Sequence, residues 1–263
     1  MPRSIKTCVR NAERTLNNLL HTLRHRPYRV ALVGEAGSGK SSLINRVVGQ
    51  YVAEIGVIET TSDADEYPTP YAPITLVDLP GYGTQARPTQ RFVHDQNLTQ
   101  YDAVLLLYSA RVKSDDVAIF QELKSLNIPC YVVRNSIDIA LEGERARTDK
   151  PPRTYAELLE EITDDARQQF HAPTLHIYAV AAHPDRPEFA LPELLDALQR
   201  ASQAYITQRI EHTLHTLEDD WTHLSRIRRI RLLTRLTAHT ITTPVPGTRR
   251  TLGVFVSAYA LGR

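Results

Sequence analysis

A glycine-rich octapeptide, Gly34–Ser41, constrains this chain more than any other feature of its sequence. It reads G-E-A-G-S-G-K-S and lies between the apolar run Tyr28–Val33 and a helical pattern at 42–48. The spacing G-x-x-x-x-G-K-S in a strand–loop–helix setting is typical of a phosphate-binding loop, and an ordinary glycine turn would not need that setting. Glycines let the backbone curl so that successive N–H groups point at a polyphosphate, and the following helix adds its positive N-terminal end. The octapeptide therefore predicts binding of a nucleoside triphosphate.

Two side chains of this loop have predicted roles of their own. Lys40 is expected to reach the β- and γ-phosphates, and the Ser41 hydroxyl is expected to ligate Mg²⁺. The full set of nucleotide contacts predicted here is Gly34, Glu35, Ala36, Gly37, Ser38, Gly39, Lys40, Ser41 and Ser42.

Apolar runs alternate with helical patterns along most of the chain. The runs predicted as buried strands are Tyr28–Val33, 74–77, 103–108, 129–133 and 175–180. The helical patterns cover residues 4–24, 88–98, 113–125, 155–170 and 191–211. This alternation predicts an α/β fold with a mostly parallel sheet and helices on both faces, with ligands at the carboxyl ends of the strands. The polar, proline-broken stretch 139–154 is expected to be an exposed, mobile loop.

The composition indicates which partners and which cellular compartment to expect. Lysine and arginine number 31 and aspartate and glutamate 30, so the net charge of +1 provides no overall field that would attract nucleic acid or a membrane. The two cysteines, Cys8 and Cys130, lie far apart and imply no disulfide framework. The first residues lack the apolar core of a signal peptide, and no apolar run reaches the roughly 18 residues of a spanning helix. We therefore expect a cytoplasmic protein for which nucleic acid is not a partner.

A second motif, Asp78-Leu79-Pro80-Gly81, follows the apolar run at 74–77. An aspartate at such a strand end can hold Mg²⁺ through water, while the Gly81 N–H can meet a γ-phosphate. A plain Pro-Gly turn is the alternative interpretation. Between the two motifs, Thr61 is the preferred candidate to complete the magnesium shell and respond to the γ-phosphate, with Thr60 second.

A third motif, Asn135-Ser136-Ile137-Asp138, follows the strand pattern at 129–133. The Asp138 carboxylate can accept the N1–H and N2–H of guanine together, a donor pair that adenine lacks, and Asn135 can bond the purine and tie loops together. The usual guanine motif has lysine where Ser136 stands, so a weaker affinity is expected. A helix cap is the alternative use of these residues. Ala181, after the last strand pattern, belongs to the expected base-capping loop.

Together these motifs resemble the immunity-related, dynamin-like GTPases. The resemblance is carried by residues 34–45, 56–61, 77–83 and 109–116. It implies a Ras-like P-loop GTPase domain at 27–200, with a helical domain built from an N-terminal helix at 1–26 and a C-terminal region at 201–263. It also implies slow GTP hydrolysis that rises when nucleotide-bound copies form a homodimer or oligomer, often at membranes. By similarity Thr61 is the first-switch threonine, and Arg111 and Lys113 lie near the nucleotide-dependent interface.

The residue that positions the attacking water is not evident from the sequence. Ras-like enzymes use a glutamine just after D-x-x-G, and Tyr82 stands there instead, so slow turnover is expected in the monomer. The missing group then comes from a partner or from an acidic side chain, Glu59, Asp63, Asp65 or Glu66. Arg111 is either an arginine finger across a dimer or a solvated residue paired with Asp115. The predicted catalytic residues are Lys40, Thr61 and Arg111.

The sequence of the C-terminal region is compatible with several roles. Residues 221–236 contain five arginines among leucines and isoleucines spaced every third residue. That pattern fits packing in a helical domain, a membrane surface, or nucleic acid. The apolar stretch 252–261 is a core helix or a shallow membrane dip. The function predicted is a GTPase that binds GTP with Mg²⁺ and releases GDP. Its alternatives are a nucleotide-regulated assembly module with little turnover and a ribosome- or RNA-linked GTPase.

Overall fold

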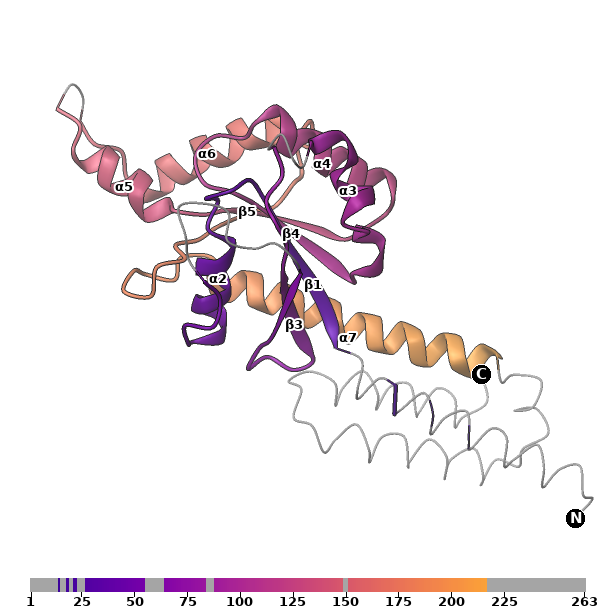
Figure 1. Ribbon diagram of the computed structural model, residues 1–263. Coiled ribbons are helices and arrows are strands. Elements are labelled where there is room, and N and C mark those ends of the chain that lie inside the picture. The colour runs from indigo at the N-terminus through magenta and orange to yellow at the C-terminus, as the bar shows by residue number, and fades with distance from the viewer. Residues whose placement is uncertain are drawn as a thin grey trace, which may run out of the picture. The chain divides into compact units, whose positions relative to one another are not determined.

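A six-stranded sheet forms the centre of the protein. The computed structural model describes residues 27–54, 64–83, 88–148 and 151–216, with positions 14, 18, 21 and 22. In the sheet the strands follow the order β2-β3-β1-β4-β5-β6 (Figure 1). Their bounds are β1 Tyr28–Val33, β2 Asp65–Pro68, β3 Ile74–Asp78, β4 Ala103–Tyr108, β5 Cys130–Arg134 and β6 Ile177–Ala179.

All strands except β2 run parallel, and this places their carboxyl ends along one edge. β1 pairs with β3 so that Leu32 lies opposite Asp78, and β4 pairs with β5 so that Tyr108 lies opposite Arg134. Every residue of β3 and β4 is buried. Strands covered on both faces read as continuous apolar runs, which is why the sequence revealed them. The predicted α/β fold with a mostly parallel sheet is confirmed.

Helices cover both faces of this sheet. Their bounds are α2 Lys40–Val48, α3 Thr89–Asp95, α4 Ser114–Ser125, α5 Ile137–Arg145, α6 Tyr155–Gln169 and α7 Leu191–Thr216, with a 3₁₀ turn, η1, at Leu98–Gln100. Figure 1 shows α3, α4 and α6 over one face and α2 with the beginning of α7 over the other. The first two turns of α7 bury the apolar positions i, i+3, i+4 and i+7 against the sheet, an amphipathic stripe. These residues are Leu191, Leu194, Leu195 and Leu198.

Two parts of the fold differ from the sequence-based expectation. Strand β2 was not predicted, because it is an edge strand of mostly exposed residues that pairs antiparallel with β3 and has no apolar run. The expected loop at 139–154 is wrong in its first half, where α5 continues to Arg145. Helix α5 begins after Ser136, which adopts a left-handed conformation, and is anchored by the fully buried Ile137. The helix was not predicted because few of its residues are buried, so the sequence shows no apolar stripe there.

Glu144 holds the segment that follows α5. Its carboxylate is buried and accepts hydrogen bonds from Arg153 Nη2 at 2.6 Å and from the Arg153 backbone N–H at 3.0 Å. Arg147 Nη1 lies 3.4 Å from the same carboxylate. These bonds, those of the Arg153 side chain foremost, lower the pKa of Glu144 to about 2. The polar stretch that looked like a free loop is therefore tied to the helix through one buried acid.

The chain divides into two compact units, residues 28–199 and a second unit of residues 1–27 with 200–263. The predicted helix at 4–24, apart from four positions, and the tail at 221–261 lie outside the described residues. The helical domain therefore stays a prediction. Within the described ranges, no helix combines the length and the apolar character needed to cross a membrane.

Glu144→Gln is expected to lower the free energy of unfolding near neutral pH, because the amide keeps the shape but loses the charge-assisted bonds to Arg153. The folded pKa of about 2 lies below the ordinary 4.5, so the carboxylate stabilises the fold above that value. Its contribution is complete above about pH 4.5 and is lost progressively as the pH falls from there through about 2. Urea unfolding at about pH 7 and about pH 3 should give a larger difference from wild type at the higher pH.

The control is Asp164→Asn, which removes an exposed ion pair with Arg167 and should change little. A difference between Glu144→Gln and wild type that is the same at both pH values would contradict the ion pair as its cause.

Candidate functional site

The glycine-rich octapeptide forms the turn between β1 and α2 at the carboxyl edge of the sheet. Gly37 and Gly39 have positive φ angles of 78° and 90°, a region that favours glycine. Gly39 is also the N-cap of α2, and a Cβ there would lie 2.1 Å from Asn135 Nδ2. Glycine at 39 is thus required both by the backbone and by its neighbour.

Lys40 lies across this loop. Its side chain is buried, and Nζ donates to the carbonyls of Gly34 at 3.0 Å and Glu35 at 3.2 Å. Ser38 is 4% exposed, and its hydroxyl has no hydrogen-bond partner in the part of the chain that the structure describes. A buried polar group of this kind is available to a ligand. The loop therefore offers a cation and an unused hydroxyl within one turn.

Ser41 and Asp78 place two oxygen groups side by side. Ser41 is the second residue of α2, and its Oγ donates to Asp78 Oδ2 at 2.7 Å. Asp78 is the last residue of β3 and is 2% exposed. A hydroxyl and a carboxylate are the ligand types that Mg²⁺ prefers, and Mg²⁺ completes its shell with water or phosphate oxygens. The pair fits the predicted magnesium position.

The residues after Asp78 pack against the loop. A Cβ on Gly81 would lie 2.7 Å from the Ala36 backbone nitrogen, and Glu35 forms a parallel bridge with Tyr82. Tyr82 is 1% exposed, and its hydroxyl donates to the buried Asp116 of α4. Burial, with Asp116 beside it, raises the pKa of Tyr82 far above its usual range. The side chain that stands in place of a water-orienting glutamine is therefore a hydrogen-bonded part of the core.

The candidates for catalysis outside the loop are scattered. Arg111 is exposed between β4 and α4, and no described residue, Asp115 included, forms an ion pair with it. Lys113 pairs with Glu35, whose hydrogen bond raises the pKa of the lysine. Glu66 pairs with Arg29 at 2.6 Å, and Asp65 is exposed opposite Asp78. The remaining candidates, Glu59, Thr60, Thr61 and Asp63, lie outside the described residues.

Asn135 connects three loops. Its Nδ2 donates to the Ser38 carbonyl at 3.0 Å, and its Oδ1 accepts from the backbone N–H groups of Ser136 at 2.8 Å and Ala182 at 3.1 Å. The side chain is buried, and both the nitrogen and the oxygen of its carboxamide are bonded to other parts of the protein. Ala182 lines the adjoining pocket, whereas the predicted Ala181 is fully buried and does not.

Asp138 lies on the first turn of α5 with a cation beside it. Arg186 Nε is 3.4 Å from Asp138 Oδ2, and Arg186 Nη1 is 2.6 Å from Glu142 Oε1. The loop that carries Arg186 is held in turn by Arg46 of α2. Arg46 donates to the backbone carbonyls of His183, Pro184 and Arg186, at 3.0 Å to His183 and 2.9 Å to Arg186.

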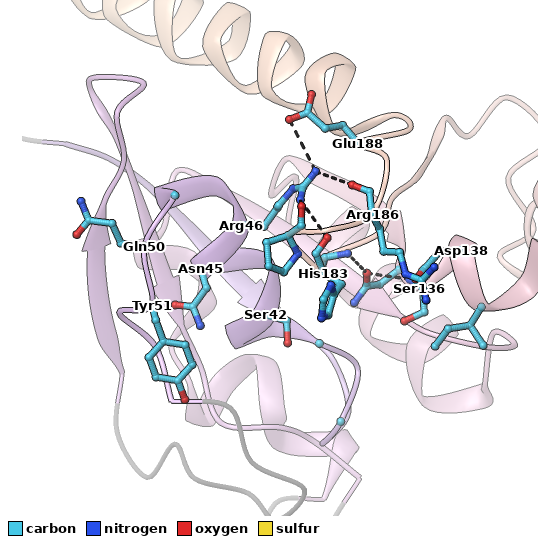
Figure 2. Close-up of a pocket in the computed structure, with 17 residues that line it drawn as sticks. Ser42, Asn45, Arg46, Gln50, Tyr51, Ser136, Asp138, His183, Arg186 and Glu188 are labelled. Carbon is cyan, nitrogen blue, oxygen red and sulfur yellow. Dashed lines mark hydrogen bonds and ion pairs between the residues drawn. The ribbon is translucent and has the colours of Figure 1, made fainter. Parts of the chain in front are cut away.

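These elements enclose a pocket of about 900 Å³ (Figure 2). Its wall includes five of the predicted nucleotide contacts, namely Gly37, Gly39, Ser42, Asn135 and Asp138. Figure 2 shows Arg46 directed at the loop 183–188, and Arg186 of that loop beside Ser136 and Asp138. Arg46, His183 and Arg186 also line the pocket and are not predicted from the sequence. No motif marks them, since they meet the other residues only through folding.

Gly39→Ala is expected to abolish nucleotide binding and to lower the free energy of unfolding by about 1–3 kcal/mol through backbone strain. The matched control is Gly49→Ala at the end of α2, which has φ 76° but open space around the added Cβ. Both variants carry the strain, and only the first drives Asn135 away. Urea unfolding should show a similar loss of stability in the two variants. Calorimetric titration of the folded proteins with GDP should then show that only Gly39→Ala loses binding. Equal loss of GDP binding in both variants would contradict the contact with Asn135.

The sequence matches one family over most of its length. The family profile described as Interferon-inducible GTPase (IIGP) matches residues 5–242. Interferon-gamma-inducible GTPase 10 of Mus musculus is 28% identical over 211 residues, which are 74% of this chain and 50% of the relative. Interferon-inducible GTPase 5 of Rattus norvegicus is 30% identical over 195 residues, 70% of this chain and 42% of the relative. The chain thus spans about half the length, or less, of these two curated relatives.

A solved structure supports the fold independently. Toc33 from Arabidopsis thaliana, in complex with Mg²⁺ and GMPPNP, matches with a TM-score of 0.52 over 78% of this chain and 94% of its own, at 13% identity. That similarity concerns the fold alone. Because the family profile covers most of the sequence, the chain belongs to the interferon-inducible, immunity-related GTPases.

Proposed function

We propose that this chain binds GTP together with Mg²⁺ and hydrolyses it to GDP and inorganic phosphate. The observation that carries the proposal is the meeting of three groups at one edge of the sheet. They are the Lys40 cation, the Ser41–Asp78 oxygen pair and the Asn135–Asp138 loop. A cation suits the triphosphate, an oxygen pair suits the metal ion, and a loop with an amide and a carboxylate suits the purine.

The phosphates would be held by the backbone N–H groups of Gly34–Ser41, by Lys40 and by the N-terminal end of α2. Lys40 then exchanges its bonds to the Gly34 and Glu35 carbonyls for phosphate oxygens. Ser41, Asp78 and Thr61 are the proposed magnesium ligands. Bound there, Mg²⁺ neutralises charge that develops on the β- and γ-phosphate oxygens.

Slow turnover of the single molecule is part of the proposal. The Gly81 N–H is available to a γ-phosphate, but the next side chain, Tyr82, is committed to Asp116 in the core. The attacking water then lacks a side chain from that position. This same observation favours the second candidate function, a nucleotide-regulated assembly module with very little hydrolysis.

Guanine specificity is tested by Asp138→Asn with GDP and xanthosine diphosphate. Xanthine has a carbonyl where guanine has the 2-amino group, so an amide side chain can donate to it while accepting from N1–H. The variant should bind GDP at least about tenfold more weakly, since each good polar contact is worth about 1–3 kcal/mol. It should bind the xanthine nucleotide more tightly than wild type does. If wild-type protein bound ADP as tightly as GDP, the assignment of Asp138 to guanine recognition would be overturned.

Activation by a second copy is proposed from the exposed Arg111 between β4 and α4. Acting across a homodimer or oligomer, its guanidinium stabilises transition-state charge, as arginine fingers do. Turnover per molecule should then rise at least about tenfold as protein concentration increases over two decades, and Arg111→Ala should remove that rise. The control is Arg91→Ala on α3, also an exposed arginine, which should leave the rise intact. Turnover that stays constant with concentration would contradict activation by pairing.

The remaining parts of the proposal concern the termini. The GTPase domain is assigned to residues 27–200, and the segments 1–26 and 201–263 to one helical domain. A cytoplasmic location is proposed, and the five arginines at 221–236 would serve packing inside the helical domain first, contact with a membrane surface second, and nucleic acid last. Binding of vesicles with and without anionic lipid decides between the first two of these uses.

A further inference from the structure

The carboxylate assigned to guanine has a cation at its side that does not come from its own motif. Arg186, in the loop after β6, lies 3.4 Å from Asp138 through Nε and 2.6 Å from Glu142 through Nη1. Asp138 and Glu142 are one turn apart on the same side of α5. The guanidinium therefore lies along this side of the helix, close to both carboxylates.

The backbone of Arg186 is fixed from the phosphate-binding side of the site. Arg46 of α2 is 11% exposed, and its guanidinium bonds the Arg186 carbonyl at 2.9 Å and approaches Glu188 to 3.9 Å. Helix α2 begins at Lys40, within the glycine-rich octapeptide. Helix α2, which carries Lys40, therefore also holds the backbone of Arg186 in place through Arg46.

The space beside Asp138 suits a flat cation. Ser136 has a short side chain and a left-handed backbone, with φ 59°, and it lines the pocket together with Asp138 and Arg186 (Figure 2). The Arg186 side chain is 43% exposed, so part of it remains open to a ligand. A guanidinium stacks on aromatic planes through both dispersion and charge, and a purine is such a plane.

We propose that Arg186 is a specificity-determining residue of this site, which covers the face of the bound purine and orients the Asp138 carboxylate toward guanine. It supplies from the loop after β6 the cation that residue 136 does not provide. The inference rests on the proposed binding of a guanine nucleotide. It adds a residue that strengthens that binding where Ser136 replaces the usual lysine.

Calorimetric titration of GDP and ADP against variants of the full chain tests this assignment. Arg186→Ala should raise the dissociation constant for GDP about tenfold and lower the preference for GDP over ADP, because stacking and orientation are lost together. Arg186→Lys, which keeps the charge but not the plane, should lose about threefold. At saturating GTP, kcat should stay within about twofold while KM rises, since the γ-phosphate end is untouched.

Rescue provides the sharpest arm of the test. Adding Ser136→Lys to Arg186→Ala returns a cation to the side of Asp138 and should restore GDP affinity to within about threefold of wild type. The charge-matched control, Arg91→Ala on α3, should change neither nucleotide affinity. The urea midpoint of nucleotide-free Arg186→Ala should equal that of wild type.

Two results would overturn the inference. One is GDP binding to Arg186→Ala that is as tight as wild type or tighter, which would make Arg186 a plug that competes with the base. The other is a double variant that binds no better than Arg186→Ala. Failure of the proposed function looks different, because wild-type protein would then show no preference for GDP over ADP. The loss of stacking in Arg186→Ala would still lower the affinity for both nucleotides.

Discussion

The site depends on the hydrogen bonds that the Asn135 carboxamide makes. One side chain bonds the Ser38 carbonyl, the Ser136 N–H and the Ala182 N–H, and so joins the loops that follow β1, β5 and β6. A buried amide that satisfies partners on three segments fixes their relative positions, because leaving any of these groups unpaired costs about 1–3 kcal/mol. Gly39 lies so close to this amide that no side chain fits there. The loops proposed to hold the phosphates and the base are thus joined to one another through Asn135.

Polar contacts of a similar kind link the site to the rest of the domain. Glu35 of the octapeptide pairs with Lys113, and the Lys113 backbone N–H donates to Asp116 at 2.8 Å. Asp116 also accepts the Tyr82 hydroxyl. Loops at the edge of a sheet have little apolar area to bury, so a few hydrogen-bonded side chains set their positions. The proposed dimer contact at Arg111 lies in the segment between β4 and α4 whose end, at Lys113, is bonded to the phosphate-binding loop.

Much of this arrangement could be predicted from local sequence. The octapeptide, D-L-P-G and N-S-x-D each carry their meaning in consecutive residues, and the buried strands appear as apolar runs. Strand β2 could not be predicted, because an edge strand with one partner needs no apolar face. The first half of 139–154 was misassigned, because α5 is stabilised by the buried Ile137 and by Glu144 with Arg153 rather than by a broad apolar stripe. Tyr82 was recognised as unfit for catalysis, but its bond to Asp116 was not foreseeable.

Motifs and apolar periodicity are local properties, so the amino-acid sequence is sufficient to identify the fold class, the family and the residues expected to meet phosphate, metal and base. The charges that surround those residues depend on tertiary contacts. Arg186 follows β6, meets Asp138 and Glu142 of α5, and has its backbone carbonyl bonded to Arg46 of α2, so these contacts form only when the parallel sheet brings the three elements together. Contacts between residues far apart in the chain leave no spacing to recognise. For that reason the cation beside Asp138 could not be predicted from the sequence.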